Sequence, residues 1–368
     1  MISLLAFLFV LSILIIAHEL GHFFAARSVG VRVEKLSLGF GPALFRKKNN
    51  NTEYSVNLIP LGGYVKMAGD SQEEYHGNPD EYFYKTPRQR AGVIFMGPLL
   101  NYILGFICFW FIFFAGYPTL TNKIGGVLDG YGGKAAGIEV GDKITAVDGK
   151  KVDFFEEIQQ IIQSKKNSAE VQLTVERGSQ IYYLNVKIRE KAVDDNLGKK
   201  RSIGLIGITP ADEIISVRHG IFVSLILAGK KTLSLTVMTY KAFWRMITGN
   251  LSMRDSVTGP LGIFYITSQA AHLGPIALLH LVAVLSISLA IFNLLPFPVL
   301  DGGHILLLFI EKIRGKGISA KVERMITQAA MTALLLLVVL VTYNDIVRFF
   351  GNKIPKGGQI NADSPAQD

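Results

Sequence analysis

Residues 1–26 of the chain read MISLLAFLFVLSILIIAHELGHFFAA. Only two serines interrupt the apolar run before residue 17, and a His-Glu-Leu-Gly-His sequence follows at residues 18–22. The stretch is long enough to cross a hydrocarbon core, which takes about 20 residues. It lacks the basic first region and the small-residue cleavage site of a secretory signal peptide. The sequence therefore predicts a transmembrane helix that carries ionisable side chains.

The rest of the chain is also rich in apolar blocks. Of its 368 residues, 49% are hydrophobic and 18% are charged, and the mean hydropathy is +0.34. An average soluble domain has about 25% charged residues, so a wholly soluble protein is excluded. We predict four transmembrane helices, at residues 1–26, 91–117, 273–310 and 326–349.

A fifth apolar stretch, Phe222–Ile247, contains four lysine or arginine residues. Each cation would cost about 2.5–3.5 kcal/mol at the centre of a bilayer. We therefore expect an amphipathic helix on the membrane surface here, within a segment that runs over residues 192–272.

The net charge of +9 fits membrane topology better than nucleic-acid binding, because the sequence has no basic stripe interleaved with aromatic residues. Lysine and arginine gather between the first two predicted helices and between the last two. The positive-inside rule places those loops in the cytoplasm. Both termini, including a polar tail at residues 350–368, and the segment between the second and third helices are then extracytoplasmic.

The loop at residues 27–90 contains a predicted β-hairpin. Glu53–Ile59 alternates as a strand, and Leu36–Gly41 can pair with it across a basic turn at Arg46–Asn51. A free edge of such a sheet can bind an extended peptide as an additional strand. An ordinary cytoplasmic hairpin remains the alternative to a membrane-associated one.

The extracytoplasmic segment contains the signals of a small α+β module. Ala136–Gly149 combines an Ala-Gly turn, a Gly-Asp turn, a short strand and an Asp-Gly turn. A helix is predicted around residues 154–162, with Asp153 as its cap, followed by strands at Val171–Glu176 and Ile181–Ile188. This order resembles a PDZ domain of the bacterial protease-associated type, over residues 122–191. The alternative is a generic small β-rich domain.

The predicted first helix carries the motif H-E-x-x-H. Residues i and i+4 share one face of a helix, so His18 and His22 can bind one metal ion while Glu19 lies beside them. Ionisable groups inside a membrane span are costly and indicate function. The alternative is a polar helix end near the membrane interface. Gly21 would let another backbone approach the site.

A catalytic zinc ion usually has three protein ligands. Cys108 is the single cysteine, which excludes a cysteine-based zinc site. The third ligand is expected in Asn293–His304, where two prolines and a Gly-Gly pair interrupt the third helix. We choose Asp301, with His304 as the competitor. The Asn293 amide can hold a substrate backbone or bond to carbonyls freed near the prolines.

Taken together, these motifs resemble the site-2 protease family of zinc intramembrane metalloproteases, in its regulator-of-sigma-E protease branch. The resemblance covers nearly the whole chain. It implies that His18, His22 and Asp301 bind one catalytic Zn²⁺, that Glu19 is the general base and that Asn293 holds substrate. It also favours a membrane-dipping hairpin. The matching motifs are His18–His22, Gly39–Pro42, Ile59–Met67, Gly97–Asn101, Gly259–Pro260 and Asn293–His304.

The expected fold is therefore a polytopic α-helical membrane protein with four transmembrane helices, a membrane-associated β-sheet and one inserted extracytoplasmic PDZ domain. The expected activity is zinc-dependent endoproteolysis of single-pass membrane proteins, such as anti-sigma factors and remnant signal peptides, in the bacterial inner membrane. The PDZ domain is a further candidate site for substrate or peptide. Two other functions stay open: a catalytically silent PDZ scaffold, which the intact Glu19 argues against, and a metal transporter, which would more often show repeated spans.

Overall fold

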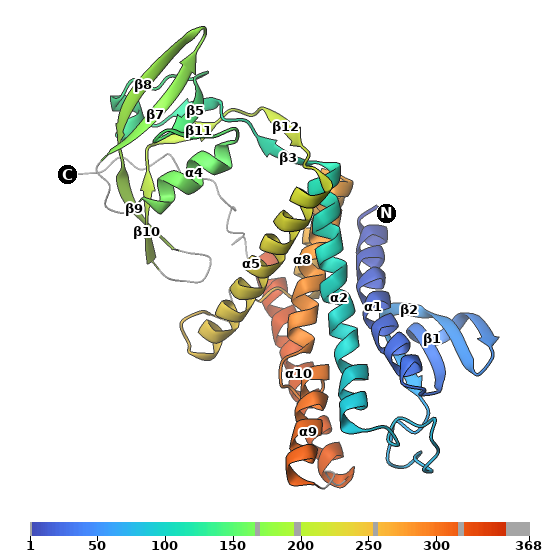
Figure 1. Cartoon of the computed structure of the whole chain (residues 1–368). Coiled ribbons are helices and arrows are strands. Elements are labelled where there is room, and N and C mark those ends of the chain that lie inside the picture. Colours follow the sequence, from blue (N-terminus) through green and yellow to red (C-terminus); the bar gives the residue numbers. More distant parts are fainter. Residues whose placement is uncertain (1, 166–169, 195–199, 253–256, 316–319, 351–368) are drawn as a thin grey trace. The chain divides into compact units, whose positions relative to one another are not determined.

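The computed structural model describes residues 2–165, 170–194, 200–252, 257–315 and 320–350 (Figure 1). The predicted polar tail lies outside the described residues from 351 onward. The chain divides into two compact units. Unit 1 comprises residues 1–109, 232–239 and 253–368, and unit 2 comprises residues 110–231 and 240–252.

The described part of the chain contains five helices that are long and apolar enough to cross a membrane. Four of them correspond to the predicted spans, and the third predicted span is split at residues 294–300 into α8 and a following helix, α9 (Asp301–Arg314). The five candidates are α1 (Ile2–Ser28), α2 (Pro87–Ala115), α5 (Ile221–Ile247), α8 (Pro275–Asn293) and, within α10 (Ala320–Phe350), Arg324–Val347.

Helix α5 corresponds to the apolar stretch that was expected on the membrane surface because of its four cations. Its most apolar stretch has a mean hydropathy of 1.5 and at most two charged side chains, because Lys230 and Lys231 are adjacent and Lys241 and Arg245 lie near the end of the helix. By length and composition alone, a count of exactly four spans is thus not confirmed.

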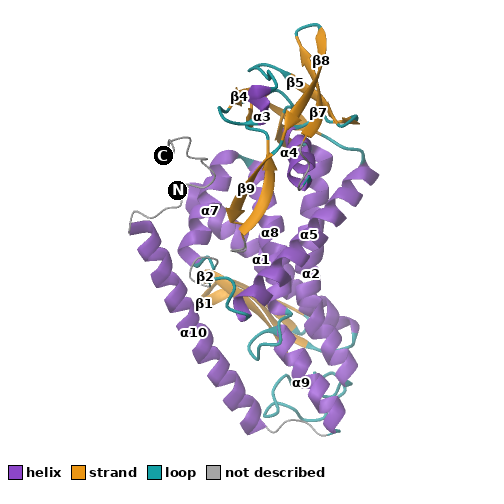
Figure 2. Ribbon diagram, turned by 90° about the vertical axis from the view of Figure 1, so that its left-hand side faces the viewer, coloured by secondary structure: helices purple, strands orange, loops and turns teal. Residues whose placement is uncertain are grey.

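The sheet of unit 1 is built from two long bent strands, β1 (Val33–Asn49) and β2 (Thr52–Met67) (Figures 1 and 2). The first half of β1 pairs on both sides with β2, since Leu36 lies opposite both Tyr54 and Val65. The second half of β1 pairs with the first half of β2, with Phe45 opposite Val56. The predicted hairpin is only partly correct: Leu36–Leu38 does pair with residues 54–56, but the strand that meets Glu53–Asn57 across the turn is Ala43–Lys48, and the turn is shorter than expected and begins after Asn49. Two bent strands thus supply four strand segments.

Helix α1 packs against the sheet, the short helix α7 (Pro260–Leu273) and α8 within unit 1. The sheet lies along it (Figure 1), and α7 contacts its N-terminal half. There, the Ser3 and Ser268 hydroxyl groups form a hydrogen bond of 2.7 Å, and the rings of Phe7 and Phe264 meet edge to face. Helix α1 therefore holds its polar motif between a sheet and other apolar helices.

The apolar core of unit 2 lies between an antiparallel sheet and the helix α4 (Phe155–Ser164). The sheet has the order β6-β5-β7-β8, with α4 packed beside it. Its strands are β5 (Lys143–Val147), β6 (Lys150–Lys151), β7 (Glu170–Arg177) and β8 (Gln180–Lys187). These elements match the predicted strand and helix order. The cap of α4 differs: Phe154 is its N-cap, and Glu157 accepts hydrogen bonds from the backbone N–H groups of Asp153 and Phe154.

The remaining elements of unit 2 extend its packing beyond residue 191. Ile206 is buried in the same core as Ile144 and Leu173, and β11 pairs with β4. These further elements are β3 (Tyr117–Leu120), β4 (Ile124–Val127), α3 (Gly132–Ala135), β9 (Arg189–Asp194), β10 (Lys200–Leu205), β11 (Ile208–Pro210) and β12 (Ile214–Val217).

Candidate metal centre and active site

The H-E-x-x-H motif lies in the C-terminal half of α1, where the helix approaches α2 very closely. A Cβ atom at Gly21 would lie 2.3 Å from the carbonyl oxygen of Met96, and one at Gly97 would lie 2.3 Å from Nε2 of His22. Both contacts are shorter than any real side chain tolerates, so glycine is required on each helix. The expectation that Gly21 admits another backbone is confirmed.

Asp301 reaches the same place from the other end of the chain. It is the first residue of α9, and an irregular stretch separates it from α8. That stretch folds tightly against the start of α9, because a Cβ atom at Gly302 would lie 2.3 Å from the Leu294 carbonyl oxygen and one at Gly303 2.1 Å from that of Phe297. The prolines end α8, and the two glycines allow the chain to turn Asp301 toward α1.

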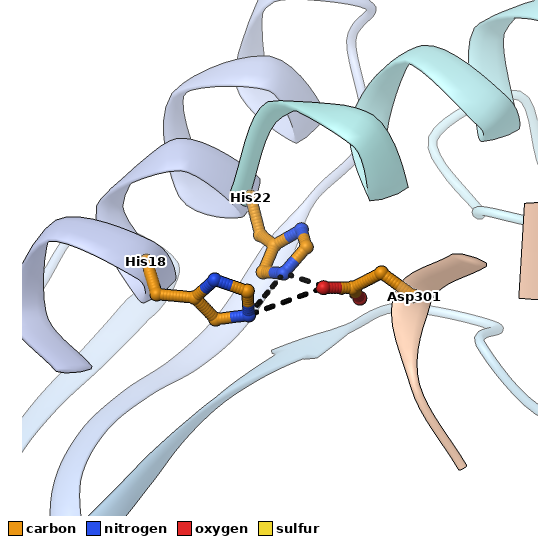
Figure 3. Close-up of side chains that lie close together, drawn as sticks. All are labelled: His18, His22 and Asp301. Atoms are coloured by element: carbon orange, nitrogen blue, oxygen red, sulfur yellow. Dashed lines mark hydrogen bonds and ion pairs between the residues drawn. The ribbon is translucent and has the colours of Figure 1, made fainter. Parts of the chain in front are cut away.

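His18, His22 and Asp301 converge within unit 1, and the two imidazoles project from α1 toward the carboxylate (Figure 3). The Nε2 atoms of the histidines are 3.2 Å apart. Asp301 Oδ2 lies 3.3 Å from Nε2 of His18, and Oδ1 lies 3.6 Å from Nε2 of His22. Three potential metal ligands thus face one point.

These separations fit a tetrahedral zinc site. With zinc–nitrogen and zinc–oxygen bonds of about 2.0–2.1 Å, two ligand atoms on a tetrahedron are roughly 3.3–3.4 Å apart. Two imidazole nitrogens and one carboxylate oxygen are also a common ligand set for a catalytic zinc, which keeps a fourth position for water or substrate. The residues therefore suit the metal in both chemistry and spacing.

The orientation of His22 is fixed by the backbone of α2. Its Nδ1 lies 2.9 Å from the carbonyl oxygen of Val93. A carbonyl oxygen can only accept, so Nδ1 must carry the proton, which leaves the lone pair of Nε2 free for a metal ion. Nδ1 of His18 is buried and has no hydrogen-bond partner among the described residues.

Glu19 is partly buried and lies between the two histidines in sequence, on a different side of α1. Its side chain approaches the sheet, because a Cβ atom at Gly63 would lie 3.0 Å from its Cγ. The carboxylate is therefore next to β2, close to the potential ligands but outside their set. This position suits a group that acts on water or on a peptide held beside the sheet.

The two remaining candidates, Asn293 and His304, lie near the irregular stretch that presents Asp301. Asn293 is partly buried at the C-terminal end of α8. His304, one turn after Asp301, lines a cavity with Tyr82 and Arg90 and lies outside the set of potential metal ligands. Sequence reasoning missed Val93 entirely, since it acts through a carbonyl oxygen that every residue possesses.

Known proteins resemble this chain over almost its whole length. Protease RseP of Yersinia pestis is 29% identical over 451 residues, covering 94% of this chain and 98% of that protein. Zinc metalloprotease RasP of Shouchella clausii is 29% identical over 428 residues, covering 95% and 99%. A protein of Campylobacter jejuni that is provisionally named a zinc metalloprotease is 32% identical over 353 residues, covering 95% of each chain.

One region of the chain is similar to a solved PDZ domain, and most of the chain matches the profile of one peptidase family. The PDZ domain of the SdrC-like protein from Listeria monocytogenes is 26% identical, covers 26% of this chain and 90% of that chain, and superposes with a TM-score of 0.20. The sequence profile described as peptidase family M50 matches residues 6–338, which include His18, Glu19, His22 and Asp301. This chain therefore belongs to peptidase family M50.

Proposed function

We propose that the protein is a zinc-dependent intramembrane endopeptidase that hydrolyses peptide bonds within or beside the transmembrane segments of single-pass proteins. The observation that carries this proposal is the convergence of His18, His22 and Asp301 on one point, with their ligand atoms within 4.8 Å of one another. The histidines lie on a helix apolar enough to cross a membrane, and Asp301 follows a second one after the irregular stretch at residues 294–300. Relatives named zinc metalloproteases support both the metal and the reaction.

The proposed chemistry assigns separate roles to the ligands and to Glu19. His18, His22 and Asp301 would hold the ion, which when bound makes water more acidic and polarises the scissile carbonyl group. Glu19 takes a proton from the attacking water and returns it to the leaving amine nitrogen. The hydrogen bond from His22 to Val93 keeps one imidazole in the tautomer that can bind a metal.

Asn293 is proposed to hold the substrate backbone. It lies where α8 ends, before the irregular stretch that leads to Asp301. A carboxamide there can donate to a substrate carbonyl oxygen or to a developing oxyanion, with no proton transfer of its own. Its location on the segment that presents Asp301 supports this role.

The sheet of unit 1 is proposed to bind the substrate in extended form. Peptide bonds within a helix are shielded, so hydrolysis requires local unwinding. Residues Gly63–Met67 pair on one side with the first half of β1, and no further strand pairs with them among the described residues. Gly63 adjoins Glu19. A substrate added at this edge as a further strand would lie beside the proposed general base.

The same sheet has the polarity of an element that dips into the membrane. Exposed apolar side chains gather at the end where β1 and β2 turn at residues 40–44 and 58–59, among them Leu44 and Leu58, which are 68% and 55% exposed. The opposite end carries Arg46, Lys47 and Lys48. If the sheet dips into the membrane by its apolar end, the exposed apolar side chains contact lipid tails and the basic side chains at the other end lie near the lipid headgroups.

For the topology, we propose four crossings, by α1, α2, α8 and α10, with α5 on the outer surface. The basic loop after α9 places the end of α8 in the cytoplasm. If α5 crossed inward, α7 would have to cross back outward before α8 begins. Helix α7 has 14 residues, or roughly 21 Å, which is short of a hydrocarbon core of about 30 Å. Unit 2 and both chain ends are then extracytoplasmic.

Unit 2 is proposed to be a PDZ-like module that controls access of substrates. The sheet β6-β5-β7-β8 with α4 beside it supports this assignment, as does the order of turns and strands in the sequence. Anti-sigma factors and remnant signal peptides are the proposed substrates in the inner membrane, and a relative from Haemophilus influenzae named regulator of sigma E protease supports a role in stress signalling.

The test is cleavage of a purified single-pass protein in detergent by the wild type and by Glu19→Gln. Cleavage by the wild type alone, within the apolar segment as located by mass spectrometry, supports an intramembrane metalloprotease. Equal cleavage by both proteins contradicts the role of Glu19. A zinc-loaded wild type that cleaves no single-pass substrate contradicts the proposed function.

A further inference from the structure

A polar pocket lies at the end of α1, within unit 1. Its volume is about 360 Å³, and it is bordered on one side by residues 27 and 30–33 and on the other by the turn between β1 and β2. The polar side chains that line it are Arg27, Arg32, Asn50, Asn51, Thr52 and Asp80. None of these residues belongs to the proposed metal site or to the proposed substrate edge, so the proposed reaction leaves the pocket without a role.

The pocket lies where two candidate membrane helices reach the same surface of the bilayer. Arg27 is the first lysine or arginine of α1 and follows its apolar part. On α2, the uncharged stretch begins at Ala91, shortly after Lys85. The ammonium group of Lys85 lies beside the pocket, since a Cβ atom at Gly30 would be 3.5 Å from its Nζ. The pocket is therefore at the level at which lipid phosphate groups would lie.

Several cations around the pocket have no acidic partner. The guanidinium carbon of Arg27 lies 4.8 Å from the centre of the Phe23 ring, and neither Arg27 nor Lys85 forms an ion pair within the part of the chain that the structure describes. Lys47 and Lys48, shortly before the turn, form none there either. An excess of unpaired positive charge attracts an anion to this place.

Arg32 and Asp80 form the polar wall of the pocket. Nε of Arg32 donates to Oδ2 of Asp80 at 2.8 Å, and Glu34 lies 3.6 Å from one terminal nitrogen of the guanidinium group. Among the described residues only the Nε–H group of Arg32 forms a hydrogen bond, so the terminal NH₂ groups keep donors for a ligand. Asp80 is the single carboxylate that lines the pocket, and its bond to Arg32 offsets its charge.

The carbonyl groups at the end of α1 are already paired inside the protein. Such groups carry partial negative charge and would otherwise oppose an anion. The carbonyl oxygen of Ala26 accepts from the Val31 N–H at 2.8 Å, and that of Arg27 accepts from the Gly30 N–H at 3.0 Å. Gly30 has a φ of +71°, which glycine adopts without strain. The helix end thus closes on itself and leaves the cations to dominate the pocket.

An exposed apolar side chain lies on α1 next to the pocket. Phe24 is 58% exposed and precedes Arg27 by three residues, so the two side chains share one face of the helix. A phospholipid has both an anionic headgroup and acyl chains, whereas free phosphate has only the charge. The combination of Phe24 and Arg27 therefore favours a lipid over a free anion.

We propose that this pocket binds the headgroup of an anionic phospholipid of the phosphatidylglycerol type. Its phosphate group lies against Arg27, Arg32 and Lys85, and its acyl chains lie along α1 at Phe24. The amide groups of Asn50 and Asn51 can bond to the headgroup hydroxyl groups. The bound lipid would join the turn of the sheet to the end of the helix that carries the H-E-x-x-H motif. The inference does not depend on the proposed proteolysis.

The experiment compares phosphatidylglycerol with phosphatidylcholine of identical acyl chains. The full chain in a non-ionic detergent is titrated with each lipid, and the bound lipids are counted by native mass spectrometry. We expect phosphatidylglycerol to bind about 10- to 30-fold more tightly, because each cation close to the phosphate contributes a factor of roughly five. Equal affinities for the two lipids would overturn the proposal.

Matched double variants assign this preference to the pocket. In Arg27→Gln/Lys85→Gln, the ratio between the two affinities should fall to about one. Lys312→Gln/Arg314→Gln changes the net charge equally, near the end of α9 and outside the pocket, and should retain the ratio. An equal loss in both double variants would mean that the lipid responds only to the overall positive charge of this surface, and it would contradict a specific site.

A competition measurement identifies the source of the anion. A large excess of inorganic phosphate, which lacks acyl chains, should not displace phosphatidylglycerol, because the contact of the acyl chains with α1 adds affinity that free phosphate cannot gain. Displacement of the lipid by inorganic phosphate would make the pocket a site for a soluble anion and would overturn the assignment to a lipid. Since no substrate is present, these results are independent of whether the protein cleaves peptides.

Discussion

Nδ1 of His22 donates a hydrogen bond to the carbonyl oxygen of Val93, across the contact between α1 and α2, at 2.9 Å. This contact connects metal chemistry to helix packing. It sets the tautomer of His22, and it exists only because Gly21 and Gly97 let the two helices approach. The proposed site therefore depends on residues that bind no metal.

The first prediction separates metal binding from proton transfer. Glu19→Gln should retain zinc, since Glu19 is outside the ligand set, yet lose cleavage by about 10²–10⁴-fold because the proton acceptor is gone. Asp301→Ala should lose both zinc and cleavage. Zinc content by mass spectrometry, measured on the same samples as cleavage, checks both statements. Zinc retained at wild-type stoichiometry in Asp301→Ala would remove that residue from the ligand set.

The second prediction concerns removal of the metal. A strong chelator should abolish cleavage, and added Zn²⁺ should restore it, because His18, His22 and Asp301 are presented by packed helices and should keep their places. The same treatment should lower the unfolding temperature, since the ion stabilises the folded state by mass action. Cleavage that persists at zinc levels below detection would contradict a metal mechanism.

The third prediction concerns a partly buried ion pair that joins α2 to α9, in which Glu311 is 28% exposed. Arg90 donates to Glu311 at 2.7 Å, and its side chain is 6% exposed. Glu311→Met should destabilise unit 1 by roughly 2 kcal/mol and weaken zinc binding, because it leaves the buried Arg90 cation without its partner on the helix that begins with Asp301.

The double variant Arg90→Met/Glu311→Met provides the control for this pair. It should recover part of the loss, since no unpaired charge remains. Unfolding temperature and zinc affinity, measured for both single variants and the double variant, give the coupling between the two residues. If the loss in the double variant equals the sum of the losses in the two single variants, Arg90 and Glu311 do not stabilise the protein as a pair.

Local patterns in the sequence predicted much of this molecule. The apolar run before His18, the Asp-Gly turn of unit 2 and the alternation at Glu53–Ile59 each depend on neighbours in the chain, so each could be predicted from a single segment. Asp301 could be chosen because only His, Asp or Glu can complete a set of two imidazoles when cysteine is excluded, and the structure brings it to His18 and His22.

Features that depend on long-range packing could not be predicted in this way. Leu36 lies opposite both Tyr54 and Val65, and nothing local indicates that one strand segment will be flanked on both sides by the same β2. The role of Gly97 depends on His22, 75 positions earlier in the chain. Helix α5 has both apolar and cationic residues, so composition leaves its place relative to the membrane open.

The fourth prediction uses a buried ion pair in unit 2. Burial raises the pKa of Asp142. Hydrogen bonds from Arg177 and from the Glu139 backbone N–H, together with the charge of Arg177, lower this pKa by a larger amount. The pKa of Asp142 therefore lies below its ordinary value of 3.8. Its contribution to stability is therefore fully present above pH 3.8 and is lost as the pH falls through the lower, folded-state pKa.

Arg177→Met should remove this acid-dependent contribution. It should also destabilise unit 2 near neutral pH by roughly 2–4 kcal/mol, because the Asp142 carboxylate is 1% exposed and would lack its partner. Lys151→Met, which breaks an exposed pair with Asp153, should cost less than about 1 kcal/mol. Hydrogen exchange of unit 2 in the full chain, corrected for intrinsic rates at each pH, measures both effects. Similar losses of stability in Arg177→Met and Lys151→Met would show that the burial of Asp142 does not strengthen its pair with Arg177.

The last prediction tests the contact between α1 and α2 directly, with Gly97→Ala and Gly92→Ala on the same helix. A Cβ atom at Gly97 would lie 2.3 Å from Nε2 of His22, whereas one at Gly92 would have no atom within 4 Å. Replacing glycine by alanine raises the intrinsic helix propensity by the same amount at both positions. Any difference between the two variants therefore comes from the contact of residue 97 with His22. Gly97→Ala should weaken zinc binding by about 10- to 100-fold, because His22 must move away from its bond to Val93, while Gly92→Ala should bind zinc like the wild type. Zinc affinity by competition with a chelator measures the difference, and equal affinities would show that the two helices can separate without disturbing the ligands.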